Sequence, residues 1–115
     1  YVGGYTEDAT KSHVLWQNTT VPYVLLETPY FSGTAVELGQ GTIVRVWHSE
    51  AINLYDGATF LNFPYAVFTS YRDVLRGGDV GGGPVDPQNG DWEGIWDEAI
   101  SDYRSAPNIY YAKYN

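Results

Sequence analysis

Short runs of β-favouring residues follow one another closely through the first half of this chain. They are rich in Val, Ile, Tyr, Phe, Trp and Thr, and Gly, Pro, Asn or Asp residues separate them. Short strands at such close spacing favour an antiparallel sheet or a small barrel. The runs cover residues 13–17, 22–27, 34–38, 42–48, 52–55 and 58–61.

Two of the separating segments have the composition of hairpin turns. Gly39, Gln40 and Gly41 stand between the runs 34–38 and 42–48. Asp56 and Gly57 stand between the runs 52–55 and 58–61. Because a short Gly-containing loop joins neighbouring antiparallel strands, we expect two β-hairpins here.

The hydrophobic period changes to that of a helix in the second half. After Pro64, apolar residues recur at the spacing of one helix face and Gly77 would end the helix, although a strand over 65–71 remains an alternative. A second helix is expected between Asp91, as its N-cap, and Pro107. A last strand is expected over 108–114. The first apolar stripe consists of Val67, Phe68, Tyr71, Val74 and Leu75, and the second of Trp92, Ile95, Trp96, Ala99, Ile100 and Tyr103.

These patterns predict an α+β fold. It would consist of an antiparallel β-sheet or small barrel of about five to seven short strands, with one or two helices packed on it. The length of 115 residues fits a single domain over 1–115. Residues 1–12 are expected to form an extended N-terminal arm, and 77–90 a long Gly/Pro loop.

Aromatic residues must supply much of the core. The chain has no Cys, and it has 4 Trp, 11 Tyr and 4 Phe, each able to bury about 150–250 Å². A domain of this size cannot bury so many rings, so we expect several to face other molecules. The candidate interface residues are Tyr1, Tyr5, Tyr30, Tyr110, Tyr111 and Tyr114.

The charge and the composition exclude several partners. The formal net charge of −8 repels nucleic-acid phosphates and anionic lipids, and no apolar run reaches the ~18 residues of a membrane span. The chain has no Met and begins at Tyr1, so we expect a removed leader or a trimmed start, and a location outside the cell or on a particle surface. The triplet that begins at Asn18 fits a glycosylation acceptor, in agreement with secretion.

No catalytic or cofactor motif is present, and we assign no catalytic residue. The oxygen-bearing residues Asp86, Asn89 and Asp91 surround a glycine turn, as calcium ligands do. Their spacing departs from the EF-hand pattern, and an Asx turn that caps the next helix explains them better. We therefore expect no cofactor, with calcium as the alternative.

Three functions agree with these features. The first hypothesis is a non-catalytic, self-assembling subunit of an extracellular filament, a pilus or a virus particle, whose partners are copies of itself or other structural proteins. The alternative is a secreted carbohydrate-binding module that uses exposed Trp or Tyr rings as platforms, with Trp92 and Trp96 as the candidates. The third is a small hydrolase that depends on Asp and Glu side chains.

Overall fold

The computed structural model describes residues 13–17, 23–73 and 86–115, and this part of the chain is built almost entirely from strands. A short 3₁₀ turn, η2 (Phe63–Tyr65), is its one helical element. The strands are β1 (His13–Trp16), β2 (Tyr23–Leu25), β3 (Tyr30–Ser32), β4 (Ala35–Leu38), β5 (Ile43–Val46), β6 (Ala51–Tyr55), β7 (Thr59–Leu61), β8 (Val67–Ser70), β9 (Gly94–Asp97) and β10 (Asp102–Tyr103).

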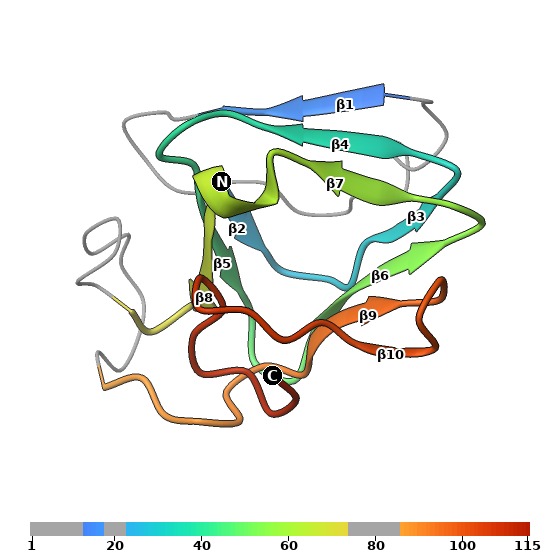
Figure 1. The fold of residues 1–115 in the computed structure, drawn as a ribbon. Coiled ribbons are helices and arrows are strands. Elements are labelled where there is room, and N and C mark those ends of the chain that lie inside the picture. The colour runs from blue at the N-terminus through green and yellow to red at the C-terminus, as the bar shows by residue number, and fades with distance from the viewer. Residues whose placement is uncertain (1–12, 18–22, 74–85) are drawn as a thin grey trace.

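The chain winds as a parallel β-helix of three turns. Each turn contributes one strand to each of three sheets, whose orders are β1-β4-β7, β2-β5-β8 and β10-β9-β6-β3. All neighbours pair in parallel except β9 and β10, which are antiparallel. Figure 1 shows the three sheets as walls around one interior.

The fold class expected from the sequence is therefore wrong in two respects. The sheets are mostly parallel rather than antiparallel, and the described residues contain no α-helix packed on a sheet. The two segments expected to be helical form strands. Of the first segment, the described residues 64–73 contain part of η2, then β8 and a turn, and residues 91–107 contain β9 and β10.

Pairing with earlier strands overrides the helical spacing in both segments. All four residues of β8, three of which are β-branched or aromatic, pair with the four residues of β5, and β9 pairs with β6. Gly94, at φ +135°, has a backbone conformation that no α-helix contains. Among the described residues of the two expected helix stripes, Phe68 and Ile95 point into the core, Trp96 lies on an outer face, and Ala99 and Ile100 lie in a turn.

The two expected hairpins are also wrong, although the turns themselves exist. Asp56 and Gly57 adopt φ values of 53° and 82°, the left-handed region that Asp-Gly turns favour. They join β6 to β7, and these strands belong to different sheets. The loop at Gly39–Gly41 likewise joins β4 to β5 across a corner of the β-helix. Each of these tight turns connects a strand of one sheet to a strand of the next sheet.

The interior is filled by side chains from all three walls. In each strand, alternate residues point inward, and parallel register aligns them from turn to turn. Val36 lies between Val14 and Phe60, for example, and Ile52 pairs with Ile95. Trp16 contacts Phe31 and Phe60 with ring centroids 5.8 and 6.3 Å apart. The buried aromatic residues thus form one continuous core.

The segment after β10 closes one end of the β-helix. Ile109 forms a parallel bridge with Phe68, and Ala112 forms one with Trp92. The Asn108 side chain donates hydrogen bonds to the carbonyls of Phe63 and Ala66 at 3.0 and 2.9 Å. The last strand expected at 108–114 is thus replaced by these isolated bridges, which cover the third turn.

Candidate ligand-binding face

The outer side of the β10-β9-β6-β3 sheet carries a row of aligned side chains. Parallel register places Tyr30 of β3 beside Asn53 of β6, and Asn53 beside Trp96 of β9. Antiparallel pairing adds Tyr103 of β10 next to Trp96. Because neighbouring strands lie about 4.8 Å apart, the row crosses the sheet perpendicular to its strands.

Aromatic rings gather in two clusters at the two ends of this row. The rings of Tyr30 and Tyr55 are nearly parallel, with an interplanar angle of 6° and centroids 6.2 Å apart. Tyr103 contacts the ring of Trp96 edge-on at 5.3 Å and stacks on the ring of Tyr114 at 4.5 Å. We call the whole surface the aromatic face, and it consists of Tyr30, Asn53, Tyr55, Trp96, Tyr103 and Tyr114.

Solvent reaches this face. Tyr30 is 52% exposed and Tyr114 is 41% exposed, whereas the other four residues are half-buried. Rings of this face are thus at the surface, and the expectation that such rings contact other molecules stays a prediction. Half-buried rings have fixed positions, so little side-chain entropy is lost when a ligand binds them.

Gly94 allows the second cluster to lie directly on β9. A Cβ atom at this position would stand 2.6 Å from the carbonyl oxygen of Tyr114 and 3.1 Å from the ring of Tyr103. The backbone amide of Tyr114 donates to the carbonyl of Glu93 at 2.9 Å and thereby fixes the chain over the strand. No other residue type leaves room for this arrangement.

Carboxylates border the aromatic face. The Ser32 hydroxyl donates to Asp56 at 2.6 Å, and the Asp56 amide donates to the Glu98 carboxylate at 3.2 Å. Burial of the Tyr103 phenol, and then the negative charge of Glu93, raise the pKa of Tyr103 above its usual value. The phenol therefore stays protonated at neutral pH and can donate a hydrogen bond.

The structure places three of the sequence-predicted residues on this face. Tyr30 and Tyr114 come from the candidate interface set, and Trp96 from the candidate platform. Trp92, the other candidate platform, is fully buried, and its indole N–H donates to the carbonyl of Tyr110 at 2.8 Å. Trp92 thus belongs to the core.

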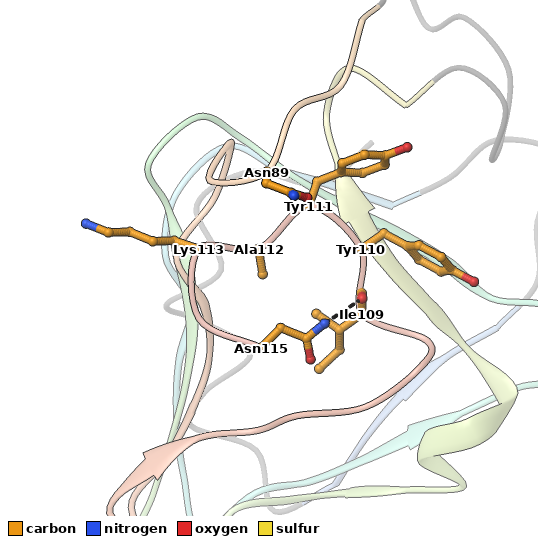
Figure 2. A pocket seen from close by; sticks show the side chains of 7 residues that line it. All are labelled: Asn89, Ile109, Tyr110, Tyr111, Ala112, Lys113 and Asn115. Carbon is orange, nitrogen blue, oxygen red and sulfur yellow. Dashed lines mark hydrogen bonds between the residues drawn. The ribbon is translucent and has the colours of Figure 1, made fainter.

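Tyr110 and Tyr111 lie apart from the aromatic face, beside a shallow hollow of about 600 Å³. Figure 2 shows their rings pointing outward from this hollow, and the Lys113 chain does the same. The Asn115 side chain at its edge is already used, because it donates to the Ile109 carbonyl and accepts from the Ala106 amide. The hollow therefore offers little to a ligand.

The candidate calcium ligands do not converge on one point. Asp91 is buried and accepts hydrogen bonds from the Ser70 hydroxyl at 2.6 Å and from the Gln88 amide at 3.0 Å. In the described part of the chain it caps no helix and forms no Asx turn, because the Gln88 amide precedes it by three residues. Asp86 and Asn89 are exposed. In the described segments, no three His, Asp or Glu side chains come together as metal ligands do.

Some sequence-predicted residues lie outside the described part of the chain. These are Tyr1, Tyr5 and Asn18, together with the arm over 1–12 and most of the loop over 77–90. Conversely, sequence reasoning missed Asn53, Tyr55, Gly94 and Tyr103. Alternation along the run 52–55 could have placed Asn53 and Tyr55 on one side of a strand, but nothing local indicated which residues lie beside them.

Comparisons with protein-family models, with curated proteins and with solved structures gave no match. The described residues also contain no helix that is long and apolar enough to span a membrane.

Proposed function

We propose that this protein binds carbohydrate through the aromatic face. Sugar rings expose C–H groups on their flat sides and hydroxyls around their edges. Tyr and Trp side chains match both features, because each has an apolar ring and a polar group that forms hydrogen bonds. A ligand site of this kind combines aromatic surface with a few placed polar groups, and the aromatic face offers Asn53 between its two clusters.

One observation supports the proposal above the others, namely the register that aligns Tyr30, Asn53 and Trp96 on three neighbouring strands. Core packing does not require large aromatic residues at outward positions. The charge agrees with a sugar ligand, since a chain of net charge −8 disfavours phosphate-bearing polymers.

A glycan screen read by tryptophan fluorescence tests this function. We expect a bound sugar to change the emission of Trp96, and the variants Tyr30→Ala and Trp96→Ala to weaken binding at least about tenfold, because each removes one stacking surface. Tyr65→Ala is the matched control, because Tyr65 is a 45% exposed tyrosine in η2, away from this face.

Binding by the Tyr65 variant should equal that of the unmodified protein. The proposal fails if no glycan in the screen binds, or if the Tyr65 substitution weakens binding as much as the Tyr30 substitution. Circular dichroism of each variant verifies that the fold is intact.

Self-assembly is a second candidate function, and the first turn of the β-helix favours it. Within the described residues, β1, β2 and β3 each pair with a strand on one side only. Such edges can accept a strand from another molecule. The C-terminal segment gives this candidate less support, because Ile109 is 3% exposed and already bridges Phe68 within its own chain. We therefore rank carbohydrate binding first.

A further inference from the structure

Asn53 is a polar residue at the centre of the aromatic face. Its backbone amide donates to the Pro29 carbonyl at 3.0 Å, whereas its half-buried side-chain amide has no hydrogen-bond partner in the described segments. An Asn side chain carries two N–H donors and an acceptor oxygen. These groups remain available to a ligand that lies between the two aromatic clusters.

The strand spacing sets the distance between the clusters. Tyr30 and Trp96 are two strands apart, so their backbones lie about 10 Å from each other, with Asn53 halfway. In a flat glycan with equatorial linkages, each sugar advances by about one such strand spacing. Sugars one and three of the glycan would then meet the two clusters, and the second sugar would lie over Asn53.

The charge around the face restricts the ligand further. Asp56 and Glu98 lie together at the ends of β6 and β9, and Glu93 is near Tyr103. The ammonium of Lys113 also lies here, 5.3 Å from the centre of the Tyr114 ring. The three carboxylates outnumber this one ammonium, so the border as a whole repels an anionic sugar. An uncharged sugar does not experience this repulsion.

We infer that the aromatic face binds an uncharged, linear, ribbon-like glycan that lies across the strands and fills at least three sugar positions. Asn53 is the specificity-determining residue, because its amide hydrogen-bonds the hydroxyls of the middle sugar. This inference rests on the proposed carbohydrate-binding function and defines its substrate class.

Titration calorimetry with β-1,4-linked oligomers of glucose, mannose and N-acetylglucosamine tests the inference. For at least one series, we expect the trisaccharide to bind about tenfold or more tightly than the disaccharide, since only the trisaccharide reaches both clusters. Galacturonate oligomers of the same lengths should not bind.

The variant Asn53→Ala should weaken trisaccharide binding about tenfold, the equivalent of one lost hydrogen bond. Asn89→Ala is the matched control, because Asn89 is an exposed asparagine in the loop before β9. Its affinity should be that of the unmodified protein. The length series needs no variant, so it tests the inference even if Asn53→Ala folds poorly.

The outcomes separate this inference from the function on which it rests. Equal affinity for disaccharide and trisaccharide, equal affinity of the two Asn variants, or binding of galacturonate would overturn the inference and leave carbohydrate binding intact. Failure of every glycan in the wider screen would overturn the proposed function and the inference together.

Discussion

Gly94 determines whether two tyrosine rings can lie on strand β9. Its φ of +135° suits glycine, and the space where a Cβ would stand is already taken by Tyr103 and Tyr114. Gly57 also has a positive φ, of 82°, but nothing lies within 4 Å of its Cβ position. A Cβ added at Gly57 would meet only the cost of the positive φ, whereas a Cβ added at Gly94 would also collide with its neighbours.

We expect Gly94→Ala to lower the free energy of unfolding more than Gly57→Ala does. Overpacking costs roughly 1–3 kcal/mol, and only the Gly94 variant incurs this cost in addition to the cost of the positive φ. Urea denaturation of both variants measures the difference. Equal destabilisation would show that the rings move aside freely and that Gly94 does not position the second aromatic cluster.

At the scale of elements, the segment that follows β10 holds the third turn closed. Its contacts join residues far apart in sequence, as the bridge between Ile109 and Phe68 shows. Backbone hydrogen bonds continue this pairing, from the Phe68 amide to the Asn108 carbonyl at 2.9 Å and from the Tyr110 amide to the Phe68 carbonyl at 2.8 Å. Without this cover, core side chains of β8 would meet water.

Ile109→Ala should therefore destabilise the protein by about 2–5 kcal/mol, the range for large-to-small changes in a core. Ile100 is the matched control, because it is 59% exposed in the turn between β9 and β10, and Ile100→Ala should change stability by less than about 0.5 kcal/mol. Thermal or urea unfolding of the two variants measures the contrast. If Ile109→Ala lowered the stability as little as Ile100→Ala, the C-terminal segment would not be needed to cover the core of the third turn.

At the scale of the whole molecule, the β-helix presents two kinds of surface to a partner, a wall and an end. The aromatic face belongs to a wall, and the pairing edges of β1, β2 and β3 belong to the first turn. The two surfaces meet at β3, because Tyr30 of the aromatic face lies on this edge strand. Carbohydrate binding should therefore be measured on the monomer, at protein concentrations below those at which copies associate.

If the first turn pairs with other copies, the sedimentation coefficient should rise with protein concentration. The negative charge of each molecule opposes this association, and salt screens that repulsion. We therefore expect larger species at 0.5 M NaCl than at 0.02 M NaCl. A constant monomer at all concentrations and both salt levels would exclude the assembly candidate, and glycan binding would be unaffected.

Local sequence determined the positions of many strands and turns. The β-branched run at β5 and the Asp56–Gly57 turn lie where composition placed them, because strand propensity and left-handed turn conformations depend on the residues themselves. The absence of Cys and the abundance of aromatic residues likewise indicated a core built on rings. Trp16, Phe31 and Phe68 are indeed fully buried.

Tertiary structure alone decided how these strands pair and which residues form the aromatic face. Tyr30, Asn53 and Trp96 are neighbours because successive turns of the chain stack in parallel. The pairing partners are distant in sequence, and no local period encodes them. The two helix predictions are wrong for the same reason. The spacing of Trp92, Ile95 and Trp96 fits one face of a helix, but pairing of β9 with β6 makes this segment a strand.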